Sequence, residues 1–234
     1  MNKVAAPREH WDALFAPSSC LVIDTTVDEA GRINAAPHAT CVRVVHEPVS
    51  FAITVSEYSD TAANILATGE WVINVVPFDL EVLSKVRTLG LPFAREVDEL
   101  EKAGLTPVPG LVSKAPRIAE CKAHFECTVE WTHLWEGRLM VVGRVVAVSI
   151  DEDCYDPSRG LIRWREMKPS AFCGFPYDGN FVAADDPVFV PIAYDGPPEW
   201  RPDLDEIVAR RGIGPSSSLG ILDLPNVLEQ ETTT

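Results

Sequence analysis

The order of strand-like and helix-like segments between residues 20 and 150 constrains the fold more than any other feature. Runs rich in β-branched residues predict strands, and turn residues separate them. Three amphipathic runs predict helices, which are inserted between strands without regular alternation. A doubly wound parallel sheet needs that alternation, so the order favours a mainly β protein, a barrel with helical insertions. The predicted strands cover residues 20–26, 40–45, 50–56, 70–76, 123–134 and 138–150, and the predicted helices 61–67, 79–88 and 96–103.

Local signals fix two of these elements closely. Ser59 and Asp60 are good N-cap residues for the first helix, and Gly69 stands where that helix should stop. The pair Glu136-Gly137 lies between the two longest predicted strands. We therefore expect those strands to form an antiparallel hairpin that exposes one face to water.

Charge and composition exclude several classes of protein. Acidic residues outnumber basic residues by 35 to 20, a net charge of −15, which argues against a nucleic-acid or membrane-surface partner. We find no secretory signal and no apolar run of about 18 residues that would span a bilayer, so we expect a soluble, cytoplasmic protein. The six cysteines show no CxxC pair and no metal-ligand spacing, which favours reduced, buried thiols and no metal site.

The composition changes near residue 178. Residues 178–234 contain seven of the 19 prolines and eleven acidic residues against three arginines. We therefore expect a domain over residues 1–178 and an acidic, proline-rich C-terminal arm over residues 179–234.

The chain contains no phosphate-binding glycine loop, no GxSxG and no HExxH motif. Small polar residues gather instead where the first predicted helix begins: Ser56, Ser59, Thr61 and Asn64. Unpaired backbone N–H groups and the positive end of the helix dipole can hold an anion such as a phosphate there. An ordinary N-cap at Ser59 or Asp60 is the alternative interpretation.

A second cluster covers residues 34–41. Its alanines and Pro37 would let a flat ligand approach the main chain closely, whereas the alternative is a plain loop entering a strand. His38 lies in this segment and is a candidate general acid, because histidine as a residue type often has that role; an exposed loop histidine is the alternative. Cys41 adjoins the same segment, where the alternative to a ligand contact is a buried strand cysteine.

These segments, in this order, resemble the flavin reductase-like proteins with an FMN-binding split barrel, over about residues 15–180. The resemblance is carried by residues 34–37, Ser56 with 59–65, 68–75, 97–106, 115–120, 125–127 and 142–146. It implies a split β-barrel, followed here by a C-terminal extension, that binds FMN and forms a homodimer.

The resemblance also assigns site residues. The segment matching Pro37, His38, Ala39, Thr40 and Cys41 is expected to line the isoalloxazine ring, largely through backbone contacts. The residues matching Ser56, Ser59, Thr61 and Asn64 are expected to hold the phosphate. Residues 93–95 of the partner subunit are expected to close the pocket.

The implied activity is an FMN-dependent oxidoreductase, in which NAD(P)H reduces the flavin and the reduced flavin passes electrons to a small-molecule acceptor. The cofactor carries this chemistry, so no catalytic side chain is assigned. Three alternatives stay open: an FMN electron carrier that does not use nicotinamide, an FMN enzyme acting on its own small organic substrate, and a split-barrel protein that has lost flavin.

Two positions depart from the family pattern. Family members often carry a lysine where Ser59 stands, and Arg43, Lys85 or Arg87 are candidates to replace its charge. Reductases of two-component monooxygenases frequently carry a histidine near the nicotinamide where Arg138 stands. An arginine at that position could meet a carboxylate or phosphate of another substrate, and a solvent-facing hairpin arginine is the alternative.

Overall fold

The computed structural model describes residues 5, 7, 8, 20–173 and 179–188. The chain divides into two compact units, Met1–Asp186 and Pro187–Thr234, and almost all described residues belong to the first. The larger strands are β1 (Val22–Val27), β2 (Ile33–His38), β3 (Val42–Val45), β4 (Ser50–Ser56), β5 (Glu70–Val75), β8 (Ala123–Trp135) and β9 (Arg138–Ile150). The helices are α1 (Asp60–Thr68), α2 (Leu80–Leu89), α3 (Glu99–Ala103), α4 (Trp164–Met167) and the 3-10 turn η3 (Glu152–Cys154). Short strands are β6 (Pro107–Val108), β7 (Arg117–Ile118), β10 (Tyr155–Asp156), β11 (Leu161–Ile162), β12 (Ser170–Phe172) and β13 (Phe181–Ala183).

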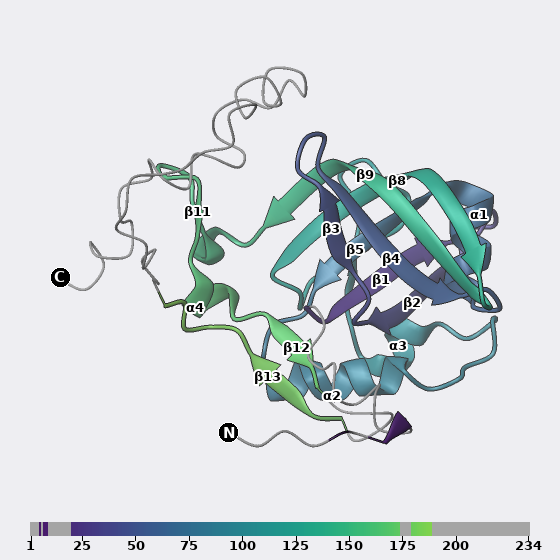
Figure 1. The fold of residues 1–234 in the computed structure, drawn as a ribbon, viewed down its shortest axis with the longest axis horizontal. Coiled ribbons are helices and arrows are strands. Elements are labelled where there is room, and N and C mark those ends of the chain that lie inside the picture. Colours follow the sequence, from purple (N-terminus) through teal and green to yellow (C-terminus); the bar gives the residue numbers. More distant parts are fainter. Residues whose placement is uncertain (1–4, 6, 9–19, 174–178, 189–234) are drawn as a thin grey trace, which may run out of the picture. The chain divides into compact units, whose positions relative to one another are not determined.

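The larger strands form one antiparallel sheet in the order β2-β1-β5-β8-β9-β4-β3. Figure 1 shows this sheet curling into a barrel. The two edge strands, β2 and β3, follow one another in the sequence with only residues 39–41 between them. The barrel is therefore split between β2 and β3, which confirms the mainly β, split-barrel prediction.

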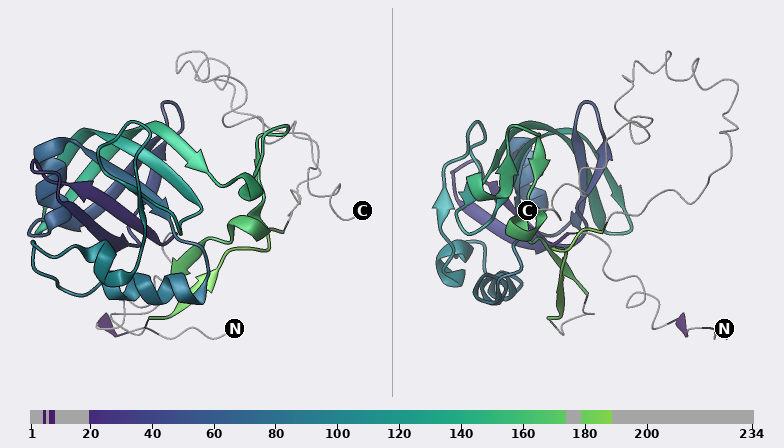
Figure 2. Two further views of the ribbon diagram at one scale, coloured as in Figure 1. Left: turned by 180° about the vertical axis from the view of Figure 1, so that it is seen from behind. Right: turned by 90° about the vertical axis from the view of Figure 1, so that its left-hand side faces the viewer.

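Apolar side chains pack on both faces of β1. Val22 faces the barrel interior with Ile53, Val55, Trp71 and other residues, and α1 closes that interior with Ala62 and Ile65. Ile23 faces the other way and packs against residues of α2 and α3. Figures 1 and 2 show these two helices together on one side of the barrel. The alternation of side chains along a strand thus gives β1 a role in two hydrophobic cores.

One glycine in the hairpin is required by packing. Trp71 is fully buried, and a Cβ added to Gly143 would lie 2.2 Å from its ring. Only glycine leaves room for the indole at this point of β9.

Most predicted elements were correct, and the hairpin turns at Glu136-Gly137 as expected. The sequence predicts no strand between residues 26 and 40, but residues 33–38 form strand β2, so the alternative of a plain loop is wrong for these residues. Helix α3 begins at Glu99 and not at residue 96, because the side chain of Asp98 caps it by accepting from the amide of Glu101. Pro37 is tolerated in β2 because β2 is an edge strand.

The beginning of the predicted arm pairs with the preceding chain. β13 lies in the expected arm and is antiparallel to β12, with Phe172 opposite Phe181. The remaining predictions for the arm concern residues beyond 188, which lie outside the described part of the chain.

In the described part of the chain, no helix is long and apolar enough to cross a membrane.

Candidate functional site

The two polar clusters found in the sequence lie side by side. The side-chain amide of Asn34 donates to Thr61 Oγ1 at 3.0 Å. The Thr40 hydroxyl, just before β3, donates to the carbonyl oxygen of Thr54 on the neighbouring strand β4 at 2.9 Å. The segment 34–41 therefore runs along the end of β4 and the start of α1, so one ligand could contact both clusters.

Helix α1 begins at the N-cap residue Ser59. Its hydroxyl accepts a hydrogen bond from the amide of Ala62 at 3.1 Å and donates to the carbonyl of Ser56 at 2.7 Å. Among the described residues, no acceptor is hydrogen-bonded to the amides of Asp60 and Thr61. These two N–H groups belong to the first turn of the helix, where an anion binds favourably.

The side chains of Thr61 and Asn64 point inward. Both residues are buried, Thr61 accepts from Asn34, and the Asn64 amide donates to Thr26 Oγ1 at 3.1 Å. These side chains hold α1 against β1 and β2. Of the four residues expected to bind phosphate, Ser56 and Ser59 are the two that are partly exposed.

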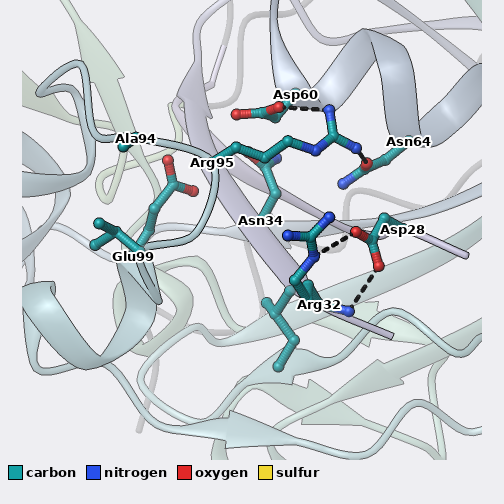
Figure 3. Close-up of a pocket in the computed structure, with 10 residues that line it drawn as sticks. Asp28, Arg32, Asn34, Asp60, Asn64, Ala94, Arg95 and Glu99 are labelled. Atoms are coloured by element: carbon teal, nitrogen blue, oxygen red, sulfur yellow. Dashed lines mark hydrogen bonds and ion pairs between the residues drawn. The ribbon is translucent and has the colours of Figure 1, made fainter. Parts of the chain in front are cut away.

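A guanidinium group lies next to the start of α1 (Figure 3). Arg95 Nη1 forms an ion pair of 2.8 Å with Asp60, and Nη2 donates to Asn64 Oδ1 at 3.2 Å. Arg95 of the same chain therefore lies at this pocket, and closure of the pocket by residues 93–95 of the partner subunit stays a prediction. Lys85, one candidate for this charge, is bound to Glu81 at 3.1 Å.

Further charged groups line the same pocket. Arg32 binds Asp28 at 2.7 Å, and the backbone N–H of Arg32 is the main cause of the lowered pKa of Asp28. Glu99 accepts a hydrogen bond from the amide of Ala35 at 2.7 Å, but burial raises its pKa by more than this bond lowers it. The negative charge of Asp60 is the one nearest the helix start, and Arg95 balances it.

The segment expected to line a flavin ring is partly accessible. Pro37, His38 and Ala39 are half-buried and Thr40 is exposed, whereas Cys41 is 7% exposed. Burial, together with the nearby Asp24, raises the pKa of the Cys41 thiol well above its usual range. This thiol packs in the barrel interior, so a ligand outside the barrel would meet the main chain at this position.

The hairpin brings Arg138 to the same place. Its Nη2 donates to the carbonyl oxygen of Thr54 at 3.2 Å, the atom that also accepts from Thr40. The register pairs Arg138 with Ser56 on β4. Arg138 therefore adjoins both clusters and forms no ion pair with a described acidic side chain.

The donors present suit a flat ligand with an anionic tail. Two unpaired amides, the Ser56 hydroxyl and Arg95 surround the helix start, and a partly exposed backbone segment leads away from it. This arrangement offers donors for an anion beside a backbone segment that a flat ring could approach. No cluster of three or more His, Cys, Asp or Glu side chains able to hold a metal occurs among the described residues.

The family model for the flavin reductase like domain matches residues 17–169. The chain belongs to the flavin reductase-like family. This membership supports a flavin-linked oxidoreductase activity and a flavin cofactor.

Individual relatives agree with this assignment. An uncharacterised protein of Aquifex aeolicus is 31% identical over 65% of this chain and 79% of its own length. RutF of Bradyrhizobium diazoefficiens, an FMN reductase (NADH), is 25% identical over 53% of this chain and 65% of its own. The crystal structure of 2-nitrobenzoate 2-nitroreductase NbaA from Pseudomonas fluorescens has the same fold, with a TM-score of 0.71 and 23% identity over 85% of this chain and 100% of that one.

Proposed function

We propose that this flavin reductase-like protein binds FMN and passes electrons from NAD(P)H through it to a small-molecule acceptor. The observation that carries the proposal is that hydrogen bonds hold the two polar clusters together. One bond runs from Asn34 to Thr61, and the other from Thr40 to the carbonyl of Thr54. RutF, a relative named as an NADH-dependent FMN reductase, supports the choice of donor.

The chain's own groups have distinct parts in this proposal. The amides of Asp60 and Thr61 and the Ser56 hydroxyl hold the phosphate, while Arg95 neutralises the Asp60 carboxylate that would repel it. The main chain of residues 37–41 lines the ring. FMN, when bound, accepts and donates hydride, so the protein supplies binding and orientation.

The visible spectrum of the purified protein tests cofactor binding. We expect absorbance typical of oxidised flavin and release of FMN on denaturation, either as isolated or after incubation with FMN. Protein that stays colourless and does not take up FMN would refute the proposal. Anaerobic mixing with NADH or NADPH then tests the donor: bleaching within seconds supports a reductase, and its absence supports the electron-carrier alternative.

Arg138 favours a second candidate function, an FMN enzyme with its own acidic organic substrate. Its guanidinium adjoins the site without an acidic partner among the described ion pairs, and a guanidinium binds carboxylates in a bidentate manner. NbaA, with the same fold, is named for nitrobenzoate, which carries a carboxylate. If Arg138 binds such a substrate, aromatic carboxylates should perturb the flavin spectrum and the corresponding amides should not. Arg138→Gln should abolish this spectral change, and Arg138→Lys should weaken it.

We also propose that the protein is a homodimer. A row of apolar residues crosses the outer face of four strands, because Trp131 is opposite Val142, Val142 opposite Ala52, and Ala52 opposite Val42. Trp131 is 48% and Val42 53% exposed. This face extends to Thr40 and Thr54. A second copy of the chain packed on this face would therefore lie next to the candidate site. Sedimentation should show a dimer, and Trp131→Asp should weaken it.

A further inference from the structure

A buried carboxylate lies in the barrel interior next to the candidate site. Asp24 on β1 is 0% exposed and lies among apolar residues of that interior. One of its oxygens, Oδ2, lies 2.8 Å from Nδ1 of His38. Its other oxygen, Oδ1, has no hydrogen-bond partner in the described part of the chain.

Such an arrangement is costly for folding alone. A buried ionised group is tolerated only when it is paired, and an unsatisfied buried oxygen adds a further penalty. The apolar neighbours on the same face, such as Val22, show that a hydrophobic side chain suits this environment. Packing alone therefore does not explain why an aspartate stands at position 24.

His38 connects this carboxylate to the outside of the barrel. It is the last residue of β2, at the split, and its side chain is 15% exposed. With Nδ1 held by Asp24, its other ring nitrogen, Nε2, forms no hydrogen bond with any described residue. In the Ser-His-Asp triad, a carboxylate held on Nδ1 orients the imidazole in the same way and leaves Nε2 as the nitrogen that takes up a proton.

Two thiols lie close enough to Asp24 for its charge to act on them. Burial first, and Asp24 second, raise the pKa values of Cys41 and Cys127 well above the usual range for a thiol. Burial likewise raises the pKa of Cys20, which acts on Cys41. These thiols therefore stay neutral at physiological pH and add no charge beside the pair.

We propose that the pair of Asp24 and His38 takes up one proton, at His38 Nε2, when the bound flavin is reduced, and thereby favours the reduced cofactor. This inference rests on the proposed function, because it requires FMN beside residues 37–41. The proton comes from solvent at the exposed edge of His38, and the electrons come from the donor. The charge of the pair changes from −1 to 0 as negative charge arrives on the flavin, which lowers their mutual repulsion. Asp24 acts as a positioning residue that fixes the ring of His38.

The experiment compares the dissociation constants of oxidised and reduced FMN at pH 6 and pH 9 in wild type, His38→Gln and Asp24→Asn. The preference for reduced FMN is the ratio of the two dissociation constants, oxidised over reduced. At pH 6 we expect this ratio to be about tenfold larger in the wild type than in His38→Gln. A tenfold ratio corresponds to about 1.4 kcal/mol, roughly the size of one charge interaction. At pH 9 the preferences should converge, and Asp24→Asn should also show a weaker pH dependence. His46→Gln, at an exposed turn histidine, is the matched control and should behave as wild type.

The outcomes separate the two proposals. If the wild type binds no FMN, the proposed function fails. If all variants bind FMN with the same preference at both pH values, the function stands and this inference is overturned. A structural role alone would alter the stability of the variants without altering the ratio of the two affinities, so an unchanged ratio in folded variants decides against the inference whatever their stability.

Discussion

The phosphate site at the start of α1 can be tested by a substitution that keeps the helix cap. Ser59→Asp places a carboxylate where the Ser59 hydroxyl now accepts from the amide of Ala62 at 3.1 Å. Aspartate and serine are about equally good N-caps, so stability should change by less than about 0.5 kcal/mol. A phosphate on the amides of Asp60 and Thr61 would lie within one helical turn of the new charge.

The expected loss of affinity follows from that distance. Two unit charges about 4 Å apart repel by about 1 kcal/mol in water and about 4 kcal/mol at the effective dielectric of a protein surface. The lower figure corresponds to a roughly fivefold weaker Kd for FMN, and the higher to a loss of nearly a thousandfold. Added salt should reduce the effect, because the site is open to solvent.

Fluorescence titration of the apoprotein provides the assay. Ser59→Asn, a neutral side chain of matching size that also caps helices well, should bind FMN nearly as the wild type does. Riboflavin lacks the phosphate, so its affinity should be the same in Ser59→Asp and Ser59→Asn. If Ser59→Asp binds FMN as tightly as Ser59→Asn at low salt, the phosphate does not bind at this helix, and the assignment of the site is wrong.

Three further predictions concern other contacts. Gly143→Ala forces a methyl group against Trp71, so urea unfolding should show a loss of about 1–3 kcal/mol, whereas Val146→Ala on the exposed face should cost far less. Glu126 is buried and accepts three backbone N–H bonds, at 2.6, 2.8 and 2.7 Å; burial raises its pKa, but these bonds outweigh burial and the pKa is lowered. Ionised Glu126 therefore contributes its full stabilisation above the pKa of glutamate in the unfolded chain, about 4.3. That stabilisation is lost as the pH falls through the lower pKa of Glu126 in the folded protein. The acid-denaturation profile of Glu126→Gln should lack this loss. Arg95→Gln leaves Asp60 unbalanced beside the phosphate and should weaken FMN binding about tenfold by fluorescence titration, with little change for riboflavin; equal losses for both ligands would contradict this role.

Local signals in the sequence were sufficient for several elements. Helix α1 has the predicted N-cap at Ser59 and ends at Gly69, because caps depend on residues within one turn of the helix end. The hairpin of β8 and β9 was equally clear from its turn residues. Strand β2 was missed because its alanines and Pro37 have low strand propensity, and its pairing with β1 overrides that propensity.

Contacts between side chains that lie far apart in the sequence were not predicted. Glu126 lies in the long predicted strand, and nothing in that pattern shows that the loop at residues 111–113 covers it and binds its carboxylate. Nothing near Arg95 in the sequence shows that it would meet Asp60, 35 positions away. Such contacts depend on how loops fold back over the sheet.

The sequence by itself determined that the chain would form a mainly β barrel with helical insertions and where polar residues would gather at strand and helix ends, because strand periodicity and caps act over a few residues. The tertiary structure alone decided which of these groups meet. The strand order places β2 beside β1, which brings His38 to Asp24, and it places β4 between β3 and β9, which brings Thr40 and Arg138 to one carbonyl of Thr54. These contacts join residues that are distant along the chain, so no local pattern could specify them.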